Sequence, residues 1–239
     1  MLELMSEVAK RCPNGVLPES YLVFDTETSG ANPADDFILQ YGFGVVRDGK
    51  LVDSFALLVK RGKEVKIHPK AIAVHGITHE QMAIEGMDPK EAFVEVLATF
   101  EHYRRMGMMF VGHNMIAFDA KLFENEARRY GSDFTFGDNE ILDTGAIVKG
   151  AQMGNYFDPR HSIREWAYKV LAVKARGVFW SLDRYCFGEF KLAEYGLNKD
   201  AAHDAGYDCK LTHYVLCRLK ERLQQEQQKA AIPEEEIPF

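Results

Sequence analysis

Two acidic side chains follow a short apolar run near the N-terminus. Residues 21–24 are apolar, Asp25 comes next and Glu27 two residues on, so the stretch predicts a buried strand that ends in acid. Side chains alternate faces along a strand, so both carboxylates are expected to point the same way. Two like charges held together need a cation, and carboxylate oxygens suit Mg²⁺ or Mn²⁺. The sequence therefore predicts a metal site at this strand end.

A second group of polar residues surrounds Asp119. His113 and Asn114 end a predicted strand, and Asp119 stands in the first turn of the predicted helix that follows. An isolated aspartate at a helix start is usually a cap or a partner of the helix dipole. Here three polar groups gather at the carboxyl end of a strand, where ligands bind in α/β sheets. We therefore expect Asp119 to add to the metal site.

The third group is His203 and Asp208. Five residues on a regular helix separate two side chains by about 140°, so both cannot face one site from within a helix. His203 is expected in a loop or first turn, with Asp208 one turn inside. A near-neutral pKa lets a histidine take a proton from water. The remaining histidines with no such context are expected on the surface or in the core: 68, 79, 102, 161 and 213.

Length and composition indicate one α/β domain with extensions. A chain of 239 residues that is 46% apolar and 27% charged can bury a substantial core. A net charge of -7 argues against coating nucleic acid by bulk electrostatics, but not against gripping a few nucleotides locally. The first ten residues carry two acids and no long apolar run, which predicts a cytoplasmic protein without a signal peptide. The four cysteines lack zinc-site spacing and are expected as buried free thiols.

The order of predicted elements favours a mixed sheet. The first strand is followed by two more within 37–60, joined by a turn at Asp48-Gly49. Helices and strands then alternate: a helix from Pro89, a strand over 108–114, a helix over 118–131, and a strand passing into a helix over 139–150. A helical face is expected at Ile163, Trp166, Ala167, Val170 and Leu171, a short helix over 181–190, and a long final helix from Ala202.

These residues together resemble a known family. Three motifs in chain order are similar to those of the DEDDh (DnaQ-like) 3′-to-5′ exonucleases: Asp25-x-Glu27, Asn114-x3-Phe118-Asp119 and His203-x4-Asp208. Residues 75–80 resemble the HGIT-x-E segment that members carry between the first two motifs. The resemblance runs from about residue 21 to 219. It implies an α/β, RNase H-like fold with a mixed central sheet flanked by helices.

The resemblance also implies roles for the acids and for His203. Two Mg²⁺ or Mn²⁺ ions would be held, with Asp25 bridging both, Glu27 and Asp208 completing one site and Asp119 holding the other, partly through water. His203 would accept the proton of the attacking water. The product would be a nucleoside 5′-monophosphate released from a 3′ end.

Further residues are expected to meet the substrate. His75 and Ile77 would contact the terminal nucleotides, although Ile77 packing inward is an equal alternative. The backbone of Thr26 and Thr28 would meet the terminal 3′-hydroxyl. Asn114 is a further candidate contact.

Two features depart from the family pattern. Gly206 stands where members usually have a larger apolar residue, and it is expected to weaken the packing of the final helix. An insertion over about 150–190 is basic and aromatic, so it is a candidate for holding single-stranded DNA by stacking and phosphate contact. Its candidate residues are Arg160, Arg164, Trp166, Tyr168, Lys169, Lys174, Arg176 and Trp180, although Trp166 lies on an apolar helical face and favours the core.

The C-terminal residues resemble a second known sequence. The domain is expected over 19–225, after an extension over 1–18 and before a polar linker and acidic tail over 226–239. The tail resembles the tip that ends bacterial single-stranded DNA-binding proteins, where a free carboxylate and a Pro-Phe pair dock on partner proteins. The matching residues are Glu234, Glu235, Glu236, Ile237, Pro238 and Phe239.

The sequence thus predicts a metal-dependent 3′-to-5′ exodeoxyribonuclease that prefers single-stranded ends. An RNA-directed member of the family, such as an oligoribonuclease or an RNase T-like enzyme, is the first alternative. A catalytically weak interaction module acting through its tail is the second. The complete set of four acids and one histidine argues against that second alternative.

Overall fold

The computed structural model describes residues 2–155, 157–158 and 160–230. Within them, five strands form one sheet in the order β3-β2-β1-β4-β5. The first three strands are antiparallel, and β4 and β5 run parallel to β1. The strands are β1 (Tyr21–Thr28), β2 (Ile38–Arg47), β3 (Lys50–Leu58), β4 (Met109–Gly112) and β5 (Ile141–Asp143). The expected hairpin and the mixed α/β sheet are confirmed.

Helices surround this sheet and follow the predicted order. They are α1 (Leu2–Ala9), α2 (Pro69–His75), α3 (His79–Glu85), α4 (Pro89–Arg105), α5 (Asp119–Arg129), α6 (Thr144–Met153), α7 (Ile163–Ala172) and α8 (Ala205–Ala230). Short 3-10 turns span Pro13–Gly15, Leu192–Tyr195 and Lys199–Ala201. The segment expected as a short helix over 181–190 is a π-helix over Arg184–Glu189. In the described part of the chain, no helix is long and apolar enough to cross a membrane.

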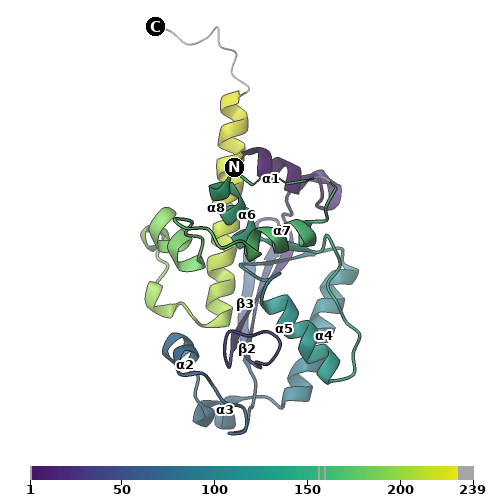
Figure 1. Ribbon diagram of the computed structural model, residues 1–239, viewed down its shortest axis with the longest axis vertical. Helices are drawn as coiled ribbons and strands as arrows, with labels where there is room; N and C mark the ends of the chain where they lie inside the picture. The colour runs from purple at the N-terminus through teal and green to yellow at the C-terminus, as the bar shows by residue number, and fades with distance from the viewer. Residues whose placement is uncertain (1, 156, 159, 231–239) are drawn as a thin grey trace.

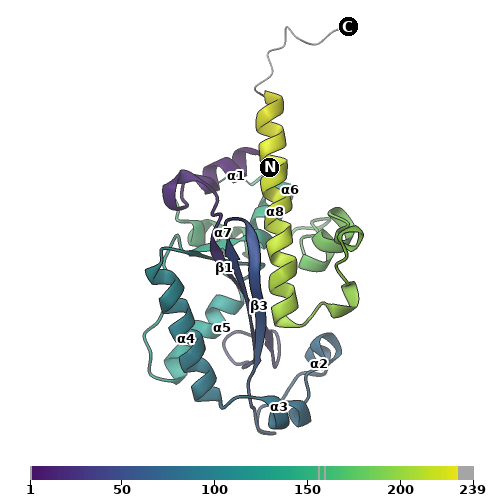
Figure 2. The ribbon, with the colours of Figure 1, turned by 180° about the vertical axis from the view of Figure 1, so that it is seen from behind.

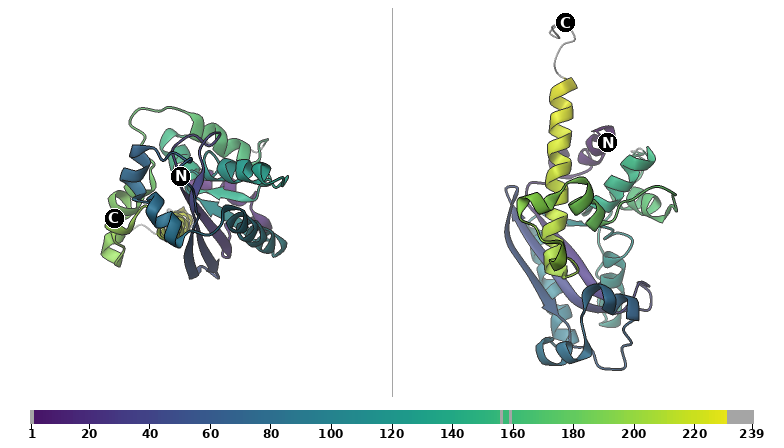
Figure 3. Two further views of the ribbon diagram at one scale, coloured as in Figure 1. Left: turned by 90° about the horizontal axis from the view of Figure 1, so that it is seen from below. Right: turned by 90° about the vertical axis from the view of Figure 1, so that its left-hand side faces the viewer.

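The two faces of the sheet are covered by different helices. α4 and α5 pack on one face, where Phe24 of β1, Phe100 of α4 and Phe123 of α5 have ring centroids 4.8–6.2 Å apart. The long α8 runs along the other face and contacts β1, β2 and β3 (Figures 1 and 2). The left panel of Figure 3, seen from below, shows α8 on one side of the strands and α4 with α5 on the other. Residues that alternate along β1 therefore face α8 or α4 and α5 in turn.

Two glycines let α8 approach the sheet closely. A Cβ at Gly42 of β2 would lie 2.2 Å from the backbone of Ala205, so a larger residue there would push the start of α8 away. A Cβ at Gly206 would meet the backbone of Phe55 on β3 at 3.1 Å. The Gly206 carbonyl also accepts a hydrogen bond from Ser54 Oγ at 2.7 Å. A side chain at position 206 would therefore be in tight contact with β3, and the glycine accommodates the close approach of α8 to that strand.

The final helix begins three residues later than predicted. Asp204 accepts a hydrogen bond from the backbone N–H of Tyr207 at 3.0 Å, as an N-cap residue does. Ala202 and His203 therefore lie before the helix.

At the other end of the chain, α1 packs against α6 and α8, and its buried Leu4 and Met5 belong to the main core.

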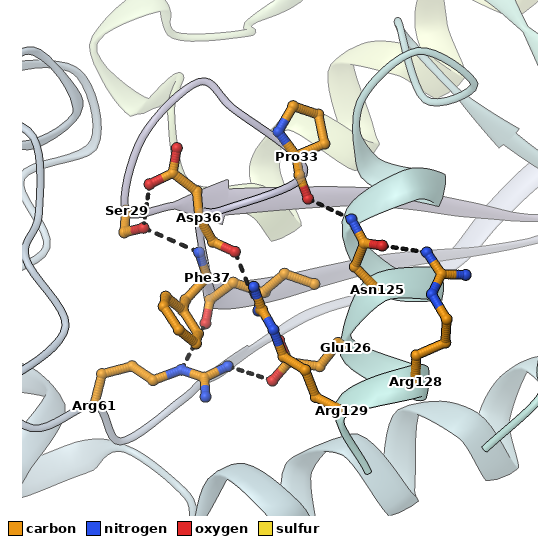
Figure 4. A network of polar contacts seen from close by, with 10 residues as sticks. Ser29, Pro33, Asp36, Phe37, Arg61, Asn125, Glu126, Arg128 and Arg129 are labelled. Atoms are coloured by element: carbon orange, nitrogen blue, oxygen red, sulfur yellow. Dashed lines mark hydrogen bonds and ion pairs between the residues drawn. The ribbon is translucent and has the colours of Figure 1, made fainter. Parts of the chain in front are cut away.

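Polar contacts fix the loop after β1 against α5 (Figure 4). Asn125 donates a hydrogen bond to the carbonyl of Pro33 at 2.6 Å, and Arg129 donates to the carbonyl of Asp36 at 3.2 Å. Beneath the loop, Arg61 pairs with Glu126 at 2.5 Å, and both side chains are buried. A buried charge without a partner is strongly unfavourable, so this pair, with the bond from Arg61 Nε to the carbonyl of Ile38 at 3.0 Å, holds α5 in one position relative to the start of β2.

Candidate active site

The end of β1 brings two carboxylates to the face covered by α8. Asp25 and Glu27 lie two residues apart on this strand, as their spacing predicts. Asp208 reaches the same place from the first turn of α8. Glu27, His203 and Asp208 each offer a ligand atom, and the three atoms lie within 4.8 Å of one another. The third predicted motif therefore meets the first across the interface between β1 and α8.

Asp119 arrives from the opposite face. It begins α5, is 4% exposed, and accepts a hydrogen bond from Thr26 Oγ1 at 2.5 Å. Thr26 points to that face because it alternates with Asp25 and Glu27. The side chain of Thr26 thus positions Asp119, a role in addition to the backbone contact expected from the sequence.

Burial raises the pKa values of all four carboxylates. Burial raises the pKa of Glu27 to about 9, with the charges of Asp208 and Asp119 adding to the effect. Burial, followed by the neighbouring charges, also raises the pKa of Asp25 well above its ordinary value. Burial raises the pKa of Asp119 to about 7 and that of Asp208 to about 6. Such a group of oxygen donors holds protons or a cation, so it fits the hard divalent ions expected from the sequence.

His203 lies outside α8 in a left-handed backbone conformation, with φ of 71°. Its N–H donates a hydrogen bond to Asp208 Oδ1 at 3.2 Å, and its Nδ1 lies 4.0 Å from Asp208 Oδ2. Nearly half of the side chain is exposed. The prediction of a loop histidine beside a helix-anchored carboxylate is confirmed. An exposed imidazole beside the acids is placed to exchange protons with water.

Gln40 of β2 also positions this end of α8. Its Nε2 donates to Asp204 Oδ2 at 2.9 Å, and its Oε1 accepts the N–H of Ala205 at 3.0 Å. One amide side chain thus holds both the cap residue and the first residue of the helix. We did not identify Gln40 from the sequence, because its partners are more than 160 positions away and no motif contains it.

The turn between α2 and α3 borders a second part of the site. His75 Nε2 lies 3.1 Å from the carbonyl of Thr28, so this turn is connected to the end of β1. A pocket of about 350 Å³ lies between them, lined by Glu27 and Thr28, by residues of α2 and by Phe118. Ile77 is 4% exposed and packs in a small apolar cluster with Leu39, Val65 and Met82. Ile77 therefore packs inward, which the sequence analysis gave as the alternative to a nucleotide contact.

Asn114 has a constrained backbone beside the acids. Its φ is 69°, and its N–H donates to Asp143 Oδ1 at 3.0 Å, while Asp143 Oδ2 accepts from the N–H of Ile116. Asp143, at the end of β5, is fully buried and also caps α6. The loop between Asn114 and Asp119 is therefore fixed by a carboxylate that sequence reasoning did not single out.

The segment over 150–190, expected as an insertion, has fewer basic and aromatic side chains free to contact nucleic acid than the sequence predicts. Trp166 is 4% exposed and belongs to the core, as its helical face indicated. Arg164 pairs with Glu124 at 2.7 Å, and Arg160 pairs with Asp158 at 2.6 Å. A nucleic-acid contact by Trp166 is therefore excluded in this fold.

The fold and this group of carboxylates define an RNase H-like α/β nuclease architecture. The model of the RNase_T exonuclease family matches residues 22–216, and the chain belongs to that family. Exodeoxyribonuclease I of Haemophilus influenzae is 24% identical over 212 residues, which are 88% of this chain and 41% of that protein. The PolC-type DNA polymerase III of Lacticaseibacillus paracasei is 27% identical over 133 residues, 55% of this chain and 8% of that protein.

Solved structures of exonuclease I share the fold. The E. coli enzyme in complex with a dT13 oligonucleotide superposes with a TM-score of 0.64 at 17% identity, over 89% of this chain and 43% of that one. The zinc-bound form of the E. coli enzyme with single-stranded DNA has the same TM-score and identity, over 86% and 41%. The chain thus spans less than half the length of these relatives.

Proposed function

We propose that the protein is a metal-dependent 3′-to-5′ exodeoxyribonuclease that prefers single-stranded ends. The observation that carries the proposal is the convergence of four carboxylates from β1, α5 and α8 with His203. No packing need of the sheet accounts for so many buried like charges. Exodeoxyribonuclease I among the relatives, and single-stranded DNA in matched structures, support DNA as the substrate.

Asp25, Glu27, Asp119 and Asp208 would hold two Mg²⁺ or Mn²⁺ ions. Such ions, when bound, would lower the pKa of the attacking water and stabilise the leaving 3′-oxygen. The zinc bound in a matched exonuclease I structure supports a divalent metal here. His203 would accept the proton of that water. Asp208, whose carboxylate accepts the backbone N–H of His203, would hold the histidine in place.

The pocket beside the acids suits the 3′-terminal nucleotide. It is lined by apolar atoms of Ala71 and Val74, which suit a base of any sequence, and by Glu27 and Thr28 at the metal end. His75, tied to the carbonyl of Thr28, borders the same pocket. Binding of the terminal base there would place its phosphodiester at the carboxylates and the backbone of Thr26 and Thr28 near its 3′-hydroxyl.

The test compares labelled single-stranded DNA, duplex DNA and RNA of one sequence in Mg²⁺, with the Asp25→Ala variant beside the wild type. We expect 5′-mononucleotides from single-stranded DNA at the highest rate and no release by the variant. Equal rates for the variant would overturn the mechanism, and a higher rate on RNA would assign the substrate to the RNA-directed alternative. DNA binding without hydrolysis would favour the interaction module.

A second proposal concerns the tail, which lies outside the residues that the structure describes. We infer from its sequence that Glu234 to Phe239 bind proteins that recognise the tip of single-stranded DNA-binding protein. In a peptide that ends at Phe239, one added glycine would block the free carboxylate and is expected to abolish such binding. A peptide of residues 230–239 competing for a tip-binding protein, and the same peptide extended by one glycine, give the measurement. Equal competition by both peptides would refute the proposal.

A further inference from the structure

Phe179 is an exposed aromatic residue on a fixed backbone. Phe179 is 59% exposed, although burial of a phenylalanine ring stabilises a fold. The amide of Gln152 holds it from both sides: Nε2 donates to the Phe179 carbonyl at 2.7 Å, and Oε1 accepts the Phe179 N–H at 3.1 Å. An exposed ring held in this way does not contribute to the core and is presented to solvent in one place.

The neighbouring Trp180 anchors the same segment at the carboxyl end of β4. His113 donates from Nε2 to the Trp180 carbonyl at 2.7 Å, and the two rings are stacked with centroids 6.1 Å apart. Lys149 Nζ lies 4.8 Å from the centroid of the Trp180 ring. Because His113 directly precedes Asn114, these contacts place the segment beside the second exonuclease motif.

Phe179 and Asn114 line one cleft. It has a volume of about 500 Å³, and Val178, Trp180 and Arg184 also border it. The pocket proposed for the terminal nucleotide has none of these residues, so the cleft is a separate place. Arg184 begins the π-helix, an element frequent at functional sites.

The charge around Phe179 complements a nucleic-acid backbone. The guanidinium of Arg184 lies over the Phe179 ring, 5.1 Å from its centroid. Arg176 and Lys174 are exposed on the same segment. Among the residues that the structure describes, none of these three makes an ion pair. An aromatic face beside unpaired cations, near a strongly acidic site, is the combination that binds single strands without sequence preference.

We propose that Phe179 is a stacking platform for a base of the single-stranded substrate upstream of the 3′ end, with Arg184 contacting the adjoining phosphate. The inference rests on the proposed function, because it needs a strand whose terminal nucleotide lies at the carboxylates. Stacking on an aromatic face is tolerant of sequence, so the platform selects unpaired bases rather than particular ones.

The test measures binding and turnover separately. Binding of a fluorescent twelve-nucleotide oligothymidylate is followed by anisotropy in Ca²⁺, chosen as the divalent ion to slow hydrolysis. Turnover in Mg²⁺ is followed on the same oligonucleotide and on the p-nitrophenyl ester of thymidine 5′-monophosphate, which has a single base and so lacks the upstream base proposed to stack on Phe179. The variants are Phe179→Ala, Phe179→Tyr and the matched control Tyr195→Ala. Tyr195 is 61% exposed with Arg218 4.2 Å from its ring centroid, but it does not line the cleft.

Phe179→Ala is expected to raise the Kd of the oligonucleotide about 5- to 100-fold, with a parallel rise in KM. Hydrolysis of the short ester stays unchanged, and Phe179→Tyr and Tyr195→Ala bind like the wild type. Wild-type binding by Phe179→Ala, or an equal loss in Tyr195→Ala, would overturn the platform. If the wild type hydrolyses no nucleic acid, the proposed function fails, and the anisotropy titration still decides whether Phe179 binds a base.

Discussion

The carboxylate of Asp208 accepts the backbone N–H of His203 at 3.2 Å, across a turn in which His203 has φ of 71°. A residue other than glycine is uncommon in this conformation, and asparagine tolerates it better than alanine does. This bond gives the backbone N–H of His203 a partner and keeps the histidine next to Glu27 and Asp208, two of the proposed metal ligands. Removing the imidazole without disturbing the turn is therefore possible with the right substitution.

Replacing His203 with asparagine tests the proton acceptor. His203→Asn is expected to lower kcat on single-stranded DNA by about 10²- to 10⁴-fold, because a general base contributes in that range. The melting temperature should stay within a degree or two of the wild type, since asparagine accepts the left-handed turn. Steady-state kinetics and a thermal melt in Mg²⁺ measure both. A variant with wild-type kcat would show that His203 is not the base.

Replacing Asp25 with asparagine separates metal binding from folding. Burial, followed by the charges of Asp119, Asp208 and Glu27, raises the pKa of Asp25 well above its ordinary value. Asp25→Asn should abolish hydrolysis, yet melt at a higher temperature than the wild type in EDTA at pH 8, because an amide stays neutral whereas the buried carboxyl of Asp25 must bind a proton or carry an unfavourable charge. The rise in melting temperature that Mg²⁺ gives the wild type should be lost. A lower melting temperature of the variant in EDTA would contradict this account.

The stability of the metal-free protein should fall as pH rises. Glu27, Asp119 and Asp208 have folded-state pKa values of about 9, 7 and 6, all above those of an unfolded chain near 4. Between pH 4 and 9 the folded state therefore binds more protons than the unfolded state, and a rise in pH favours unfolding. Protonation of these groups stabilises the fold fully below about pH 4, and this contribution is lost as pH passes each folded-state value.

Thermal melts in EDTA from pH 7 to 9 check this sign, above the range in which the buried His113 and His213 oppose it with pKa values lowered to about 4. Mg²⁺ competes with protons for the same carboxylate oxygens. The rise in melting temperature that Mg²⁺ gives should therefore be larger at pH 8.5 than at pH 5.5. The Asp25→Asn variant is the control and should show a smaller dependence on both pH and metal. A metal-free melting temperature that increases across this range would refute the raised pKa values of these buried groups.

The sequence predicted the acids because local rules govern their positions. The period of a strand places Asp25 and Glu27 on one face, and helix geometry separates His203 from Asp208; the structure agrees with both. The start of α8 was placed three residues too early, because the apolar pattern does not reveal the cap at Asp204. An aspartate directly before a helix is the sequence signal of such a cap.

Other parts of the site depend on contacts between distant residues. The bonds of Gln40 to Asp204 and Ala205 join β2 to α8, and no spacing rule connects them. The burial of Ile77 depends on how the turn after α2 packs on β2. Phe179 stands in a segment without periodicity, so composition pointed to the insertion as a whole but could not distinguish this ring from the buried Trp166.

Removing the amide of Gln40 tests whether the start of α8 must be held for catalysis. Gln40→Leu keeps the size of the side chain but loses both bonds, so the turn carrying His203 is free to shift relative to Glu27. A misplacement of about 1 Å can lower a rate about 10²-fold, and we expect a 10- to 100-fold fall in kcat. Oligonucleotide binding in Ca²⁺ should change less than threefold, because Gln40 does not line the pocket for the terminal nucleotide. Gln81→Leu, on the exposed surface of α3, is the matched control and should behave as wild type. A Gln40→Leu variant with unchanged kcat would show that α8 is positioned by its packing on Gly42 and Phe55 alone.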